Sequence, residues 1–355
     1  MTLQGAAIDP QAYHALVSGQ ARGLGPAVQR FGLRAASLPY GWAMRLRNQL
    51  YDNGWKHTHR APVPVVSVGN LTLGGTGKTP CVEYIARHYR ERDLRVAILS
   101  RGYGADAGPN DEALVLEENL PDVPHLQGSD RAALAVTAVE ELESEILLLD
   151  DGFQHRRLAR DLDIVLIDAT APWGHGFIFP RGLLREPVAG LRRAHLLLLT
   201  RCDQASNENL AMLRQTLARE APGTPVVESE HRPVAWMSSA GETPPLDHAG
   251  RRPVAAFCGL GNPAAFRGTL ETMGLNVGAF RAFPDHHRYL RAEIDDLEAW
   301  ASRQPADALI ATTQKDLVKI ALTELADRPL LALRIGLHVR AGEEALTHAL
   351  DGVLR

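Results

Sequence analysis

Short apolar runs alternate with longer amphipathic segments from Pro64 onward. The short runs are rich in Val, Ile and Leu and have the length of buried strands. Strands are predicted at 65–68, 95–99, 146–149, 163–167, 195–199, 254–258 and 308–311, and helices at 81–90, 130–142, 264–273 and 292–302. Because strands that alternate with helices pair in parallel, this order predicts an α/β fold with a mostly parallel sheet flanked by helices.

The first sixty residues have a different pattern. Residues 1–27 are small, polar and Gly-rich, and we expect them to be poorly ordered. Between residues 28 and 50, aromatic and aliphatic residues stand beside arginines, a combination that suits a basic amphipathic helix lying on an anionic membrane. A helix that packs on the protein's own core with a solvated basic edge is the alternative. Pro39 and Gly41 are expected to interrupt the helical run.

Composition argues against several functional classes. The chain has 38 Lys and Arg against 42 Asp and Glu, a formal charge of −4, so we expect no nucleic-acid partner. Its three cysteines lie far apart, which fits neither a disulfide framework nor a zinc site and favours a reducing compartment. No run of about 18 apolar residues predicts a transmembrane helix, and the N-terminus lacks the apolar core of a signal peptide. We therefore expect a cytoplasmic protein that can still touch a membrane surface.

A glycine-rich loop follows the first predicted strand. Its sequence is Gly74-Gly75-Thr76-Gly77-Lys78-Thr79, directly before a predicted helix. In such a loop, backbone N–H groups surround phosphates, the lysine reaches the β- and γ-phosphates, and the hydroxyl binds Mg²⁺. Gly77, Lys78 and Thr79 match these roles, but Thr72 stands where the usual pattern has its first glycine. The loop predicts a P-loop NTPase-like fold, with a purely structural turn as the alternative.

Two carboxylates follow the strand predicted at 146–149. Asp150 and Asp151 would lie at the edge of the sheet where ligands of α/β folds bind, and P-loop enzymes need an acidic residue there to hold Mg²⁺. A plain turn is the alternative. Gln154 and His155 follow at the same end of the sheet. Thr200-Arg201-Cys202-Asp203 occupies the place of a GTPase's Asn-Lys-x-Asp, but it lacks both Asn and Lys, which argues against guanine specificity.

These motifs resemble those of tetraacyldisaccharide 4'-kinases. The resemblance rests on residues 69–79 and on Asp150-Asp151-Gly152-Phe153-Gln154-His155. Further similar segments are 99–104, 110–112, 182–187, 283–287 and 313–316, so that the resemblance covers about residues 60 to 320. It implies an ATP- and Mg²⁺-dependent kinase that phosphorylates the 4'-hydroxyl of a lipid disaccharide, tetraacyldisaccharide 1-phosphate, in lipid A biosynthesis. It also implies a peripheral protein at the cytoplasmic face of the bacterial inner membrane.

The resemblance implies roles for individual residues. Lys78 is expected to act in catalysis, and Asp111 with His286 to activate the acceptor hydroxyl, although spacing alone does not separate His286 from His287. The other implied contacts are with phosphate (Gly74, Gly75, Thr76, Gly77, Lys78, Thr79 and Arg131), with metal (Thr79, Asp150, Asp151, Gln154 and Glu186) and with the acceptor (Arg101, Tyr103 and Arg185). Members of this family begin with a markedly apolar helix, whereas this chain has about 25 extra, less hydrophobic residues first.

The predicted organisation has three parts. They are a membrane-associating segment (1–60), a P-loop kinase domain (61–232) and a smaller C-terminal α/β domain (233–355) that completes the cleft, with a boundary at the polar, Pro-rich stretch 232–253. We expect a monomer. Two other functions stay open: a P-loop kinase for a soluble small molecule, which needs no basic-aromatic N-terminus, and a regulatory P-loop ATPase, which needs no acid–base pair.

Overall fold

The computed structural model describes residues 10–102, 111–285 and 287–354. The chain forms two compact units, each made of segments that are distant in the sequence. Unit 1 comprises residues 1–76, 151–229 and 339–355, and unit 2 comprises residues 77–150 and 230–338. The three-part division expected from the sequence stays a prediction.

Unit 1 contains a parallel sheet and the two N-terminal helices. Strand β1 (Val65–Asn70) pairs with β5 (Leu162–Asp168), β5 with β6 (Leu196–Thr200), and β6 with the first residues of β7 (Val226–Met237), all in parallel. Leucines of α6 (Asn207–Glu220) pack on β5 and β6 and complete a buried apolar cluster. Unit 1 also holds α10 (Glu343–Gly352) and the short 3-10 helices η2 (Gly174–Gly176) and η3 (Val188–Arg193).

The expectation of poor order before residue 28 is wrong for residues 10–27. This region contains α1 (Pro10–Ser18) and the start of α2 (Leu24–Asp52). Tertiary contacts fix it: the Tyr13 hydroxyl donates to the Pro180 carbonyl at 2.8 Å, and Arg30 donates to the carbonyl of Ala21 at 2.7 Å. Short polar segments lack this order when they are isolated, so propensity alone predicted the opposite.

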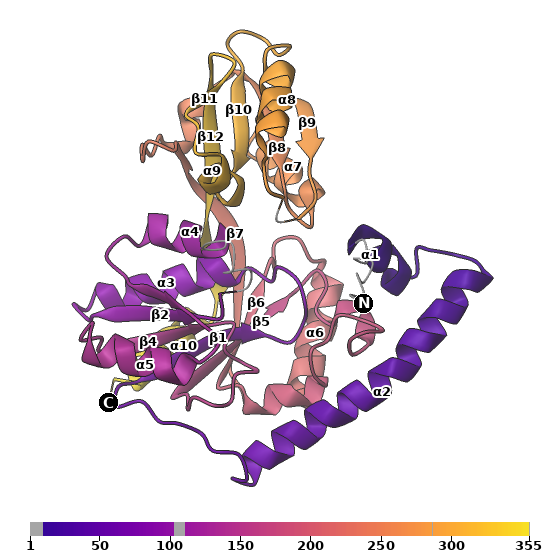
Figure 1. Ribbon diagram of the computed structural model, residues 1–355, viewed down its shortest axis with the longest axis vertical. Helices are drawn as coiled ribbons and strands as arrows, with labels where there is room; N and C mark the ends of the chain where they lie inside the picture. The colour runs from indigo at the N-terminus through magenta and orange to yellow at the C-terminus, as the bar shows by residue number, and fades with distance from the viewer. Residues whose placement is uncertain (1–9, 103–110, 286, 355) are drawn as a thin grey trace, which may run out of the picture. The chain divides into compact units, whose positions relative to one another are not determined.

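The expected break at Pro39 and Gly41 is also wrong. Helix α2 runs without interruption through both residues, as Figure 1 shows. Pro39 costs one helical hydrogen bond, but its neighbours are held in place. The Ser37 hydroxyl donates to the carbonyl of Ile178 at 2.9 Å, and Gly41 is buried so closely that a Cβ there would lie 3.2 Å from the Ile178 side chain. Gly41 therefore allows close packing against Ile178 and does not break the helix.

Unit 2 contains two groups of parallel strands. In the first, β2 (Val96–Ser100) pairs with β3 (His125–Gln127) and β4 (Ile146–Asp150), and the helices of the same segment are α3 (Lys78–Arg90), α4 (Asp111–Asn119) and α5 (Arg131–Glu140). In the second, β10 (Leu309–Thr313) pairs with β8 (Pro253–Cys258) and β12 (Arg328–Ala341), and β8 pairs with β9 (Asn276–Ala282). The expected mostly parallel α/β fold is confirmed.

Helices cover the second group of strands (Figure 1). These are α7 (Pro263–Thr272), α8 (Arg291–Ala301) and α9 (Gln314–Ile320), while β11 (Glu324–Leu325) pairs antiparallel with β12 and η4 (Leu246–Ala249) follows β7. Two apolar clusters form the core, one that includes α7 and one that includes α8 and α9. The ends of β10 and the start of α9 thereby place polar residues beside α4.

Candidate active site

The glycine-rich loop connects β1 to α3. Gly77 directly precedes the helix with φ of +82°, and Gly74 has φ of +112°, a region of backbone space that disfavours side chains. The N-cap residue of α3 is Gly77, which has no side chain that could cap the helix. The first N–H groups of such a helix point toward a bound phosphate, and the helix dipole favours a negative charge at this end.

Residues of β6 hold the first half of this loop. The Thr200 hydroxyl donates to the Thr76 carbonyl at 2.9 Å, and Arg201 donates to the Gly75 carbonyl at 2.9 Å while it pairs with Asp168. Thr200 and Arg201 are the positions where a GTPase would carry its guanine motif. Because the sequence lacks the Asn and Lys of that motif, neither residue was expected to have a role, and their contact with the loop was not predicted.

The two predicted metal carboxylates follow β4. Asp150 is its last residue and is 8 % exposed, and Thr79 in the first turn of α3 is 9 % exposed. Burial first, and then the Asp150 carboxylate, raises the pKa of the Cys81 thiol to about 12. Thr79 and Asp150 are oxygen donors of the kind that Mg²⁺ prefers, and phosphate oxygens and water would complete its coordination. These residues fit the ion.

Asp151 has an unusual backbone. Its φ of +53° lies in the left-handed region, where a residue other than glycine needs support from its surroundings. Arg185 provides such support because its guanidinium donates to Asp151 Oδ2 at 2.7 Å. Arg185 also donates to Gln154 Oε1 at 3.3 Å. Arg185 thus contacts two of the predicted metal residues, whereas sequence analysis placed it on the acceptor side.

A second polar group forms between α4 and α9. Lys315 pairs with Glu112 at 2.7 Å, and Lys319 lies 3.6 Å from Asp111 and 3.5 Å from Asp316. Burial by itself would raise the pKa of Glu112, but Lys315 and then Lys78 lower it below its usual value. The Glu112 carboxylate is therefore ionised and lies within electrostatic range of the loop lysine.

No role was predicted from the sequence for Glu112, Lys315 or Lys319. Burial would lower the pKa of Lys315, but Glu112 and more distant carboxylates raise it. The signal was present, because Glu112 and Lys315 lie in segments 110–112 and 313–316, which carry the family resemblance. What was missing was their contact across about 200 residues of sequence.

The remaining predicted residues lie in several places. Arg131 begins α5 and is 4 % exposed, and Arg101 follows β2. Tyr103 and His286 lie outside the described residues. The neighbouring His287 stacks on Phe283 and lies 3.0 Å from Glu293.

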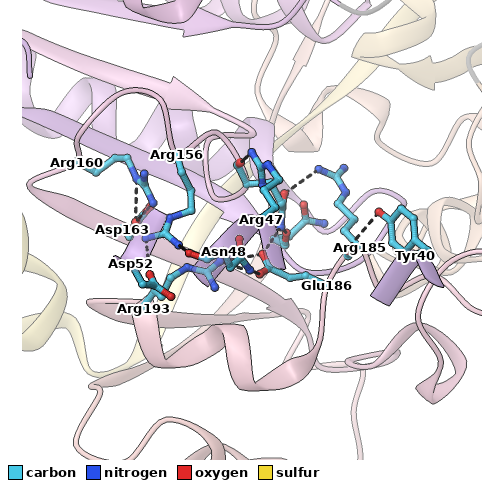
Figure 2. A network of polar contacts seen from close by, with 12 residues as sticks. Tyr40, Arg47, Asn48, Asp52, Arg156, Arg160, Asp163, Arg185, Glu186 and Arg193 are labelled. Atoms are coloured by element: carbon cyan, nitrogen blue, oxygen red, sulfur yellow. Dashed lines mark hydrogen bonds and ion pairs between the residues drawn. The ribbon is translucent and has the colours of Figure 1, made fainter. Parts of the chain in front are cut away.

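Glu186 belongs to a polar network in unit 1 (Figure 2), and its hydrogen bond with Gln154 makes Gln154 part of the same network. Gln154 Nε2 donates to Glu186 Oε1 at 3.1 Å and to the carbonyl of Asn70, the last residue of β1, at 2.9 Å. The network thereby links the segment after β4 to the strand that leads into the glycine-rich loop.

A parallel α/β fold with a glycine-rich loop before α3 and a buried carboxylate at the end of β4 defines a P-loop nucleotide-binding protein. A family model described as tetraacyldisaccharide-1-P 4'-kinase (LpxK) matches residues 29–355. The chain belongs to this family.

Individual members of this family are similar to this chain over most of its length. The chain is 45 % identical over 340 residues to the tetraacyldisaccharide 4'-kinase of Anaeromyxobacter dehalogenans (strain 2CP-C), covering 90 % of this chain and 89 % of the relative. It is 38 % identical over 333 residues to that of Syntrophus aciditrophicus, covering 87 % and 89 %. The crystal structure of LpxK from Aquifex aeolicus in complex with ATP matches with a TM-score of 0.73 and 31 % identity, covering 92 % of this chain and all of that one.

Proposed function

We propose that this protein transfers the γ-phosphate of ATP to the 4'-hydroxyl of tetraacyldisaccharide 1-phosphate. The observation that carries the proposal is the family match over residues 29–355, which includes the glycine-rich loop and the carboxylates after β4. ATP would bind with its phosphates at the start of α3. The loop N–H groups and Lys78 would hold the β- and γ-phosphates, and Arg131 would add a positive charge.

Thr79, Asp150 and Asp151 are the residues that would hold Mg²⁺, which when bound neutralises charge on the phosphates. Arg185 would fix the Asp151 side chain, with which it pairs at 2.7 Å. Glu112 would help to position Lys78, because the two opposite charges interact. Arg101 and Tyr103 would contact the acceptor sugar.

Asp111 would accept the proton of the 4'-hydroxyl while the sugar oxygen bonds to the γ-phosphorus and ADP leaves. Phosphoryl transfer has a loose transition state, so the base mainly orients the hydroxyl and takes its proton late. Lys319, 3.6 Å from Asp111, places a positive charge beside that carboxylate. His286 would orient or relay the proton. The stacking of His287 on Phe283 favours His286 for this role.

The test is transfer of labelled γ-phosphate from ATP to purified tetraacyldisaccharide 1-phosphate in detergent micelles. A labelled lipid bisphosphate is expected. Label that appears only in a soluble sugar acceptor would favour the small-molecule kinase, and ATP hydrolysis without any transfer would favour the regulatory ATPase.

Helix α2 supports a peripheral site of action at the inner membrane. Its exposed apolar residues share one face, because each residue advances about 100° around a helix and their spacings of three, four or seven keep them within about 80° of arc. These residues are Leu24, Val28, Phe31, Leu38, Trp42 and Leu46, with exposures from 40 to 87 %. We call them the apolar stripe.

Basic side chains accompany the apolar stripe. Arg34 and Arg45 are exposed beside it, and each basic group near an anionic surface contributes about 1 kcal/mol. Exposed apolar patches of this kind mark sites of association. We propose that the stripe enters the headgroup region of the cytoplasmic leaflet. Among the residues that the structure describes, no helix is both long enough and apolar enough to span a bilayer.

Anionic vesicles test this attachment. Substituting Phe31 and Trp42 together with alanine should abolish most vesicle binding and raise KM for the lipid more than KM for ATP. Met212→Ala is the matched control because Met212 is an apolar residue of the same unit that is 58 % exposed on another helix, α6. Unchanged vesicle binding by the double variant would contradict the proposal. The expected monomeric state can be checked by sedimentation.

A further inference from the structure

The carboxylate of Glu186 is fully enclosed by protein donors. It is 0 % exposed, and Arg193 donates to both of its oxygens at 2.9 and 2.8 Å. Asn48 Nδ2 donates to Oε2 at 2.9 Å, and Gln154 Nε2 donates to Oε1 at 3.1 Å. Figure 2 shows Asn48 and Arg193 converging on Glu186. Since a carboxylate has about four lone-pair positions, these four hydrogen bonds use its whole accepting capacity.

The packing around Glu186 is equally close. A Cβ on Gly190 would lie 2.7 Å from Glu186 Oε2, so the backbone of η3 touches the carboxylate directly. A metal ion would therefore have to displace a hydrogen-bond donor to reach these oxygens. A buried carboxylate whose accepting positions are all filled resists such a change, because an uncompensated buried charge is costly.

One chain of contacts leads from Glu186 to Asp151. Glu186 accepts from Gln154, whose side-chain carbonyl accepts from Arg185 at 3.3 Å, and Arg185 donates to Asp151 at 2.7 Å. Arg47 of α2 holds the backbone of the same segment by donating to the carbonyl of Gln154 at 2.6 Å. Two neighbouring residues of α2, Arg47 and Asn48, thus contact the network from the helix face opposite the apolar stripe.

We propose that Asn48 and Glu186 are positioning residues that hold Gln154 and, through Arg185, Asp151, and that Glu186 is not a metal ligand. This inference rests on the proposed function only in that kinase activity is its readout. It connects the helix that carries the apolar stripe to a carboxylate of the site. Loss of the Asn48 amide would leave a lone pair of Glu186 buried without a donor, and the carboxylate and Gln154 would shift to regain one.

The experiment compares Asn48→Ala, Asn48→Asp, Glu186→Gln and the exchange double variant N48D/E186Q in the full-length chain. Both Asn48→Ala and Glu186→Gln should lower kcat about tenfold with KM for ATP within about twofold of wild type, since small displacements of reacting groups cost rate steeply. Asn48→Asp should lose more, because it places two buried carboxylates together. The exchange retains one amide and one carboxylate beside Arg193 and should regain about tenfold over Asn48→Asp.

Asn53→Ala is the matched control. Asn53 lies one residue beyond the end of α2 and is exposed, and its side chain makes no hydrogen bond to other described residues, so this variant should keep wild-type kcat. If wild type and Asn53→Ala both failed to phosphorylate the lipid, only the proposed function would be contradicted. The positioning role would then be tested by whether N48D/E186Q recovers the melting temperature and the Mg²⁺-ATP affinity that Asn48→Asp loses.

Two results would overturn the positioning role. In the first, Glu186→Gln lowers kcat, N48D/E186Q does not restore it, and the Mg²⁺ concentration needed for half-maximal activity rises about tenfold or more. This result would identify Glu186 as a metal ligand. In the second, the variants lose activity only in proportion to the fraction of protein that is unfolded, and kcat per folded molecule is unchanged. The network would then stabilise the fold without positioning the site.

Discussion

Gly69→Ala tests whether strand β1 and the segment after β4 must lie as close as the structure places them. A Cβ on Gly69 would lie 2.6 Å from both the backbone nitrogen and the Cβ of Phe153. Phe153 is 0 % exposed, and Gly152 N donates to the carbonyl of Val68 at 3.1 Å, so the segment has little freedom to withdraw. Restoring an ordinary contact of 3.4 Å requires a displacement of 3.4 − 2.6 = 0.8 Å.

That displacement has two measurable consequences. Overpacking of a core contact costs about 1–3 kcal/mol of stability. Phe153 lies between Asp151 and Gln154, so the same shift moves both residues, and a misplacement of about 1 Å can cost about 100-fold in rate. We therefore expect Gly69→Ala to lower the free energy of unfolding by about 1–3 kcal/mol, and kcat for lipid phosphorylation by about 10- to 100-fold.

Urea denaturation and steady-state kinetics measure these two effects. Gly278→Ala is the matched control, since Gly278 also lies within a strand, β9, and a Cβ there would meet nothing within 4 Å. It should leave the urea midpoint nearly unchanged or slightly raised, with kcat at the wild-type level. If Gly69→Ala and Gly278→Ala gave the same midpoint and the same kcat, the close approach of Gly69 to Phe153 would have no role.

Three further predictions concern other residues. Lys78→Ala should retain less than about a tenth of wild-type turnover in the transfer assay, because Lys78 is the charged side chain of the loop; a higher residual rate would refute its role. Asp111→Ala and His286→Ala should each cut kcat by roughly 100-fold with little further loss in the double variant, whereas additive losses would show the wrong pairing. Burial lowers the pKa of His125 to about 4, against a hydrogen bond to Ala113 that raises it. Because the unfolded chain binds this proton below about pH 6.5, up to about 3 kcal/mol of stability is lost between pH 6.5 and 4, and His125→Gln should flatten urea midpoints there.

Local signals predicted the strands that are almost fully buried, but they missed the partly buried strands and several helices. The leucine run of β6 and the apolar run of β4 are buried throughout, and buried strands of a parallel sheet read as continuous apolar sequence. Helix α4 was missed because it is short and its stability comes from tertiary contacts such as the pair of Glu112 and Lys315. Strand β12 was missed because its second half is only partly buried and mixes charged with apolar residues.

The site divides in the same way. The phosphate-binding roles of Gly77, Lys78 and Thr79 could be predicted from the sequence, because these three residues are consecutive and lie at one loop and the start of one helix. The hydrogen bonds from Thr200 and Arg201 to that loop cross 124 and 126 residues of sequence, and no local pattern encodes such a contact. Asp151 and its left-handed backbone depend likewise on Arg185, 34 residues away.

For helix α2, the sequence pattern predicts one apolar and one polar face, but it does not predict which of the two faces packs against the protein. Amphipathic helices of globular proteins ordinarily bury their apolar face. Here Phe31 and Trp42 are 75 and 67 % exposed, while Arg47 and Asn48 face inward to Gln154 and Glu186. Hydrogen bonds from Arg47 and Asn48 hold the polar face, so the helix stays in place with its apolar stripe uncovered. Such an inverted arrangement depends on these inward polar contacts, because the exposed apolar stripe adds little burial. The same residues that hold the helix in place therefore also decide which of its faces stays exposed.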